Sequence, residues 1–309
     1  MIVVVGMNPA LDRILSVPNF SVGATLKADS VTVLPAGKGA NVAAVLRVLG
    51  APVRYTGFVG RGEIERYRER LDGVPCAIVS VDGETRTDTT IIDPLHGTET
   101  HVREPGFVIS RNIVTTFVNA LLVDITRGDT VVLAGSLPPG ASDDSYAEII
   151  RECHKRGATT SLDSSGRALK AGAAAVPTLL KPNREELHEL TDRPVDSIDD
   201  ILAAADELIA RGVGAVAVSL GVDGAVLIAN GSAWHGRADV PKAVNTVGCG
   251  DAFVAGWTAA RVEGRNHEDQ LREALSVAAA NAMTSGAGIV EVEHVKQMRQ
   301  IAVIKQIRS

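Results

Sequence analysis

The second half of the chain alternates between helix-forming and strand-forming segments, and this alternation restricts the fold more than any other feature. From Ser110 onward, most helical patterns are followed by a short run of strand length. The successive segments are Ser110–Val123, Val131–Ala134, Asp143–Arg156, Thr160–Asp163, Ala168–Ala173, Thr178–Lys181, Ile198–Arg211, Ala215–Ser219 and Ala225–Ile228. Such alternation is typical of right-handed βαβ units. It therefore predicts an α/β fold whose parallel sheet has helices on both faces.

The first half of the chain contributes strands of two kinds. Apolar runs that suit a buried sheet occur at Ile2–Val5, Val53–Val59 and Ala77–Val81. Partly alternating runs occur at Arg13–Val17, Ala24–Leu34 and Thr85–Ile92. Their polar content favours a small exposed sheet over the main core. At the other end of the chain, the charged, amphipathic tail Val292–Arg308 predicts a surface helix.

Length, charge and cysteine content exclude several classes of protein. At 309 residues the chain is long enough for one large α/β domain or two smaller ones; it has no long linker, and we interpret 1–309 as a single domain. Its formal net charge of −6 offers no electrostatic basis for binding nucleic acid or an anionic membrane. Three cysteines without a paired motif argue against a disulfide framework or a structural zinc. With neither a basic leader nor an apolar run of membrane-spanning length, the sequence predicts a cytoplasmic protein.

A glycine-broken turn runs into a helix of small residues at Asn245–Gly256. Gly248 and Gly250 permit a tight bend, and the helix that follows presents free N–H groups at its first turn. Such a helix start binds phosphate or a developing oxyanion. Asp251 stands at the same place. It is therefore either a general base that takes the proton of an attacking hydroxyl or an ordinary helix cap.

A second glycine-rich turn, Pro35–Ala43, leads into an apolar helix at Ala40–Leu49 and carries Lys38 between two glycines. It is not a Walker A loop, because Gly39 replaces the Ser or Thr that would hold magnesium. The turn can hold an anion or a sugar against the helix start, or it can be an ordinary strand-to-helix connection. Arg86, near the start of an alternating strand, is likewise either solvated or placed to bind a ligand.

Eight short motifs follow one another along nearly the whole chain. They are Asn8…Asp12, Gly37–Asn41, Thr85–Thr87, Gly135–Pro138, Asp163–Gly166, Lys181–Glu186, Ser219–Gly221 and Gly248–Asp251. In this combination the chain resembles the ribokinase-like sugar kinases, in their phosphofructokinase B branch. The resemblance implies a ribokinase-like three-layer α/β sandwich, with a mostly parallel central sheet and a small β-sheet lid at about 11–34 and 86–103. It also implies a homodimer in which two lids pack face to face.

The resemblance assigns roles to individual residues. It makes Asp251 the catalytic base for a sugar hydroxyl, and the hole that binds the transferred phosphoryl group is formed by Gly248, Cys249 and Gly250. The residues that match sugar-binding positions are Asp12, Gly37, Lys38 and Asn41. Those that match the region handling nucleotide phosphates and Mg²⁺ are Lys181, Asn183 and Glu186, the last acting on the metal through water. The remaining matches to the ATP site are Ser219, Gly221, Gly224 and Asn281.

Two positions depart from the family pattern. Cys249 stands where the family usually has alanine, and since the hole uses backbone N–H groups we expect activity to survive this change. A thiol at a helix start can be acidified and sensitive to oxidation. Ala36 stands where the branch often has glycine, which is tolerable only if the φ angle there is negative.

Charge indicates the substrate class. Lys38 and Arg86 are expected on opposite sides of the sugar site; a neutral sugar needs neither cation, whereas a phosphosugar needs at least one. We therefore expect a sugar phosphate as the substrate. The resemblance further implies ATP- and Mg²⁺-dependent phosphorylation of a hexose phosphate, with fructose 1-phosphate giving fructose 1,6-bisphosphate. Tagatose 6-phosphate and fructose 6-phosphate are alternative substrates. A non-catalytic sugar-binding or regulatory member of the fold is the alternative class of protein.

Overall fold

The computed structural model describes residues 1–309 and contains a large sheet of ten strands in the order β14-β13-β12-β11-β10-β9-β8-β1-β4-β5. These strands are β1 (Ile2–Gly6), β4 (Val53–Gly60), β5 (Cys76–Val81), β8 (Thr130–Ala134), β9 (Thr159–Asp163), β10 (Leu179–Leu180), β11 (Ala215–Ser219), β12 (Ala225–Ala229), β13 (Ser232–Arg237) and β14 (Val303–Arg308). From β5 to β11 all neighbours are parallel, whereas the pairings from β11 to β14 are antiparallel. The expected α/β fold with a mostly parallel central sheet is confirmed.

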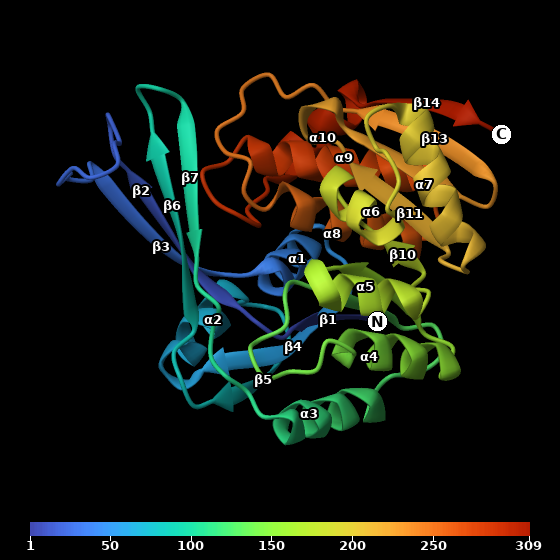
Figure 1. The fold of residues 1–309 in the computed structure, drawn as a ribbon, viewed down its shortest axis with the longest axis horizontal. Helices are drawn as coiled ribbons and strands as arrows, with labels where there is room; N and C mark the ends of the chain where they lie inside the picture. The colour runs from blue at the N-terminus through green and yellow to red at the C-terminus, as the bar shows by residue number, and fades with distance from the viewer.

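Helices cover both faces of this sheet (Figure 1). They are α1 (Lys38–Val48), α2 (Ile64–Arg70), α3 (Arg111–Val123), α4 (Ser145–Lys155), α5 (Gly166–Ala174), α6 (Arg184–Thr191), α7 (Ile198–Ala210), α8 (Cys249–Val262), α9 (His267–Ala282) and α10 (Val292–Ile301), with 3₁₀ turns at Arg61–Glu63 and Gly221–Asp223. The central strand β1 shows how the layers form. Its Val3 and Val5 pack into a core shared with α3 to α7, while Ile2 and Val4 pack into a core shared with α1, α2, α8, α9 and α10.

A second, four-stranded sheet, here named the lid sheet, projects from one side of the molecule (Figure 1). Its order is β3-β2-β6-β7, from strands β2 (Ala10–Ser16), β3 (Ser30–Ala36), β6 (Arg86–Asp93) and β7 (Thr98–Arg103). The end of the lid sheet next to the main body, here named its root, is formed by Ala10 on β2 and its register partners Ala36 on β3 and Arg86 on β6. The lid sheet is therefore attached to the main body where these three strands begin or end.

Two sequence-based expectations about secondary structure were wrong. The tail 292–308 is not one helix: α10 ends at Ile301, and β14 follows as an edge strand paired with β13, which the sequence did not predict. Ala302 takes an extended conformation, and Ile304 beyond it packs beside Gly236 against the sheet. In the lid sheet, β3 begins at Ser30, so residues 24–29 form no strand.

The structure lacks two features, a membrane-spanning helix and a cluster of metal-binding side chains. No helix combines the length and the apolar character that a membrane crossing requires. No group of three or more His, Cys, Asp or Glu side chains is arranged to hold a metal ion.

Candidate active site

A cleft of about 480 Å³ lies between the lid sheet and the first turns of α1 and α8. Strand β1 lies between β4 and β8, so the chain connections diverge on either side of it, and open α/β sheets bind their ligands at such a switch point. Apart from Val247, the lining consists of polar, charged and glycine residues. It comprises Asp12, Gly37, Lys38, Asn41, Arg86, Asp88, Thr89, Thr90, His101, Arg103, Gly135, Ser136, Ser165, Thr246, Val247, Gly248, Gly250 and Asp251.

Gly248 forms the turn that starts α8 at the floor of the cleft. It takes a left-handed conformation with φ of 83°, and a Cβ atom here would stand 2.8 Å from both Ala287 Cα and Gly288 N. Only glycine fits this position, because a side chain would be strained by the backbone and would collide with the neighbouring segment. The turn thus aims the free N–H groups and the positive end of α8 into the cleft.

Asp251 lies in the first turn of α8 and is buried, with 6% of its surface exposed. Its Oδ2 accepts a hydrogen bond of 2.8 Å from Asn41 Nδ2. Burial raises the pKa of Asp251 to about 6, although the charge of Lys38 opposes that rise. The N-cap of α8 is Gly248, and no side chain caps the helix, so the interpretation of Asp251 as a helix cap is wrong. A buried carboxylate whose pKa lies near neutrality suits a general base.

Two lysines share one carboxylate beside Asp251. Asp163, at the end of β9, is 1% exposed, and its Oδ1 lies 2.8 Å from Lys38 Nζ and 3.3 Å from Lys181 Nζ. Burial would raise the pKa of Asp163, but Lys181 and Lys38 lower it below its usual value. Burial would likewise lower the pKa of Lys38, but Asp163 and Asp251 raise it. Lys38 therefore stays protonated, and the contacts to Asp163 hold both lysines next to the helix start.

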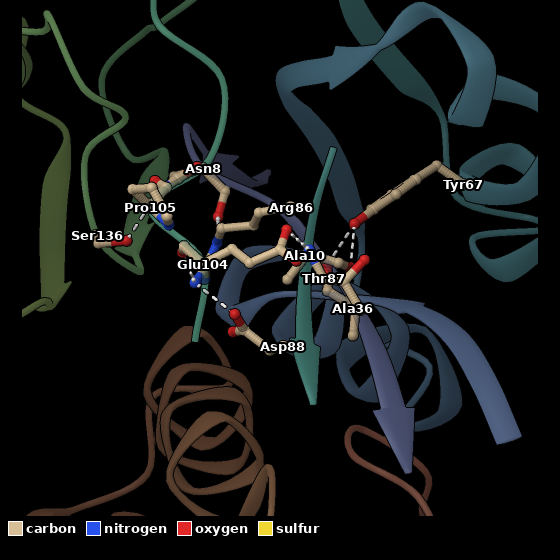
Figure 2. A network of polar contacts seen from close by, with 10 residues as sticks. All are labelled: Asn8, Ala10, Ala36, Tyr67, Arg86, Thr87, Asp88, Glu104, Pro105 and Ser136. Atoms are coloured by element: carbon tan, nitrogen blue, oxygen red, sulfur yellow. Dashed lines mark hydrogen bonds and ion pairs between the residues drawn. The ribbon is translucent and has the colours of Figure 1, made fainter. Parts of the chain in front are cut away.

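Arg86 forms part of the lid wall of the cleft, and its side chain is only 13% exposed. Its Nη1 donates to Asp88 Oδ1 at 2.8 Å, and weaker bonds reach the backbone oxygens of Glu104 and Asn8 (Figure 2). The alternative that Arg86 is a solvated strand residue is therefore wrong. Asp88 holds the guanidinium of Arg86 in position before any ligand binds.

Asp12 faces the same cleft from β2. Burial raises its pKa to about 7, with Asp88 and Asp251 adding to the rise. Arg103 on β7 is the register partner of Asp88 and is exposed, without an ion pair of its own. It is a third cation in the cleft, after Lys38 and Arg86.

Sequence reasoning missed several residues that the structure places at or beside the cleft. Arg103, His101 and Asp88 could have been found from the two-residue period of the lid strands, since they share one face. Asp163 lies 125 positions from Lys38, and nothing local in the sequence indicates their contact. Asn8 belongs to the Asn8…Asp12 motif, but its own function was not predicted. In the structure its side-chain amide donates to Ser136 Oγ (Figure 2).

The residues predicted for the nucleotide lie outside the lining of this cleft. Lys181 Nζ would lie 3.6 Å from a Cβ built on Gly250, so it reaches the start of α8. Asn183 is the N-cap of α6 and forms a capping box with Glu186, with bonds of 2.8 and 2.9 Å. Ser219, bridged to Asn183, ends β11, and the turn after it contains Gly221 and Gly224. The nucleotide role of this group stays a prediction.

Asn281 supports the floor of the cleft from inside the protein, and Cys249 is half-buried beside it. Asn281 is fully buried: its Nδ2 donates to Val247 O at 2.8 Å, and its Oδ1 accepts from Gly288 N at 2.9 Å. It presents no free polar atom to a nucleotide base. The expected acidification of Cys249 was wrong, because burial raises the pKa of its thiol. The departure at Ala36 is tolerated, since its φ angle is not positive.

The cleft combines a helix start, a buried base and fixed cations, which is what phosphoryl transfer to a hydroxyl requires. Comparison with known proteins supports the assignment to enzymes that transfer a phosphoryl group. The chain matches the family described as pfkB family carbohydrate kinase over residues 1–294. A 1-phosphofructokinase of Haemophilus influenzae is 32% identical over 294 residues, covering 94% of each chain. The chain therefore belongs to the pfkB family of carbohydrate kinases.

Solved structures support the same fold. The tetrameric inhibited form of phosphofructokinase-2 from Escherichia coli has a TM-score of 0.88 at 26% identity, covering 97% of this chain and 98% of that one. Arabidopsis thaliana ribokinase complexed with ribose and ATP has a TM-score of 0.76 at 25% identity, with the same coverage. The resemblance to ribokinase-like kinases is thus confirmed over nearly the whole chain.

Proposed function

We propose that this kinase transfers the γ-phosphoryl group of ATP to fructose 1-phosphate, giving fructose 1,6-bisphosphate and ADP. Curated relatives at 32% identity over nearly the full chain, from four bacteria, are named 1-phosphofructokinase. The observation that carries the proposal is the buried Asp251 beside the glycine turn of α8, in a cleft that also holds three cations. The cations suit a substrate that already carries a phosphate.

In the proposed reaction, Asp251 accepts the proton of the attacking sugar hydroxyl. The hydroxyl oxygen bonds to the γ-phosphorus while the bond from that phosphorus to the bridging oxygen of ADP breaks. The developing charge meets the first-turn N–H groups of α8 and the ammonium of Lys181. Asn41 orients the carboxylate by its 2.8 Å hydrogen bond.

The phosphate already on the sugar would bind to the face of the lid sheet that lines the cleft. Arg86 is oriented there by Asp88, and Arg103 lies free one strand away. A guanidinium pairs with phosphate through two parallel hydrogen bonds, so two arginines recognise a phosphosugar better than a neutral sugar. Asp12, on the neighbouring strand β2 and the same face of the lid sheet, would bind sugar hydroxyls.

ATP and Mg²⁺ complete the proposal. Ribokinase from Arabidopsis was solved with ATP, which supports the same donor here. Mg²⁺ usually keeps several waters, and Glu186 would act on it through one of them, since only its Oε2 is used in the capping box. Lys181, Asn183, Ser219, Gly221 and Gly224 would surround the nucleotide. Mg²⁺ bound there would neutralise phosphate charge.

Tagatose 6-phosphate and fructose 6-phosphate remain the alternative substrates within the proposal, because the cleft could take either phosphate position. The non-catalytic alternative has no support, since Asp251 and its flanking glycines are in place. Use of ATP and a phosphosugar is consistent with action in the cytoplasm. We also propose a homodimer formed through the lid sheet.

Coupled measurement of ADP release tests the substrate. Fructose 1-phosphate, fructose 6-phosphate, tagatose 6-phosphate, fructose and ribose would be compared at matched concentrations with MgATP. We expect the highest kcat/KM with fructose 1-phosphate and far lower values with both free sugars. Equal values for fructose and fructose 1-phosphate would contradict a phosphosugar kinase.

A further inference from the structure

Helix α2 stands between the root of the lid sheet and the segment 284–290, which lies behind the turn at Gly248. Two of its side chains make long-range hydrogen bonds that the proposed chemistry does not use. They are Tyr67 and Arg70, three residues apart and therefore on one side of the helix. The other arginines of α2, Arg66 and Arg68, are exposed and pair with glutamates three residues before them.

Tyr67 fastens the root of the lid sheet. It is fully buried, and its hydroxyl lies 2.6 Å from Ala10 O and 2.7 Å from Ala36 O (Figure 2). These two residues are register partners, and Ala10 also pairs with Arg86, so one hydroxyl holds the point where β2, β3 and β6 meet. Burial raises the pKa of the phenol well above its usual value, so the hydroxyl keeps the proton that it donates.

Arg70 fastens the segment behind the floor of the cleft. Its Nη2 donates to Ala287 O at 3.0 Å and to Gly288 O at 2.9 Å. Ala287 packs against Gly248, where a Cβ would stand only 2.8 Å away. Gly288 has φ of 63°, and a Cβ there would stand 2.7 Å from Asn41 Cα. This segment therefore touches both the start of α8 and the residue that orients Asp251.

We propose that α2 keeps the lid sheet and the floor of the cleft in register, with Tyr67 and Arg70 as positioning residues for phosphoryl transfer. The inference rests on the proposed roles of Gly248 and Asp251. The lid sheet carries Arg86 and Asp12, which would hold the phosphosugar, whereas the floor would hold the phosphoryl group. A rigid connection between them sets the distance from hydroxyl oxygen to phosphorus, on which the rate depends steeply.

Four variants test the inference in the full-length enzyme: Tyr67→Phe, Arg70→Met, both together, and Arg68→Met as a control on the same helix. With fructose 1-phosphate, we expect each of the first two to lower kcat roughly 10- to 100-fold, the effect of a small misplacement. The KM for ATP should change less than about twofold, because neither residue lies at the proposed nucleotide site. The double variant should be little slower than the slower single variant, since either change breaks the same connection. Arg68→Met should match the parent enzyme.

Circular dichroism and thermal unfolding would accompany the kinetics, and Arg70→Lys, which retains a donor, should recover part of the lost kcat. Multiplicative losses in the double variant, or unchanged kcat with only a lower Tm, would overturn the inference and leave α2 a packing element. Failure of the proposed function looks different, because the parent enzyme would then release no ADP with any phosphosugar.

Discussion

Asp251, Asp12 and Asp163 are three buried or half-buried carboxylates near one cleft, and their environments drive their pKa values apart. Two lysines lower the pKa of Asp163, so it stays ionised and fixes Lys38 and Lys181. Burial raises the pKa of Asp251 to about 6 and that of Asp12 to about 7. Separation of this kind distinguishes a carboxylate that positions other groups from one that exchanges a proton.

These values predict a pH dependence. Asp251 must be ionised to accept a proton, so activity is present above its pKa and is lost as the pH falls through about 6. If Asp12 must also be ionised, the decline begins near pH 7 and steepens below it. We expect this acidic limb in kcat/KM for fructose 1-phosphate measured from pH 5 to 8.5. In the Asp12→Asn variant, the part of the decline in kcat/KM that begins near pH 7 should disappear. A profile that is flat down to pH 5 would contradict the assignment.

Arg86 is expected to read the phosphate of the sugar. Arg86→Ala should weaken binding of fructose 1-phosphate by about 1.5–3 kcal/mol, the range for hydrogen bonds to charged groups, while ATP affinity stays nearly unchanged. Calorimetric titration of each ligand would measure both effects. Arg111, exposed at the start of α3, provides the control Arg111→Ala. Equal losses of kcat/KM on fructose 1-phosphate and on fructose would show that Arg86 does not recognise the phosphate.

The two faces of the lid sheet differ in chemical character. One face carries Asp12, Arg86 and Asp88 into the cleft. Because side chains alternate along a strand, the register places Val31, Val33 and Val102 on the opposite face, where they are 52%, 45% and 57% exposed. An uncovered apolar sheet face is a common site of protein association.

The proposed homodimer can be tested on that face. Val33→Lys places a charge where two lid sheets would pack, so it should shift the protein from dimer to monomer at micromolar concentration in light scattering. Val123→Lys, at an 80% exposed position of α3, should leave the mass unchanged. A parent protein that is monomeric and fully active at that concentration would refute the dimer.

Much of the molecule could be predicted because its elements have strong local patterns. The strand at Ile2–Val5 and the helix at Ile198–Arg211 differ from the observed β1 and α7 by one residue at an end. The last two strands of the main sheet, β13 and β14, could not be predicted in the same way. Ser232–Arg237 mixes small, aromatic and charged residues, and β14 becomes a strand only because β13 offers it an edge.

The residues of the cleft also divide into those that could be predicted from the sequence and those that could not. Motifs beside glycine turns, such as Gly37–Asn41 and Gly248–Asp251, could be recognised locally and meet in the fold. The contacts that tune them could not, because Asp163 and Asn281 act on residues remote in sequence. At the scale of the whole chain, the net charge of −6 opposes an anionic substrate, so binding depends on the cations fixed at close range.

The turnover of Asp251→Asn tests the central claim most directly. The amide keeps the shape of the side chain but cannot accept the hydroxyl proton, so kcat with fructose 1-phosphate and MgATP should fall roughly 10²- to 10⁴-fold. Binding of fructose 1-phosphate, measured by calorimetry on the same variant, should change far less. Near-normal turnover in a folded Asp251→Asn enzyme would show that Asp251 is not the base.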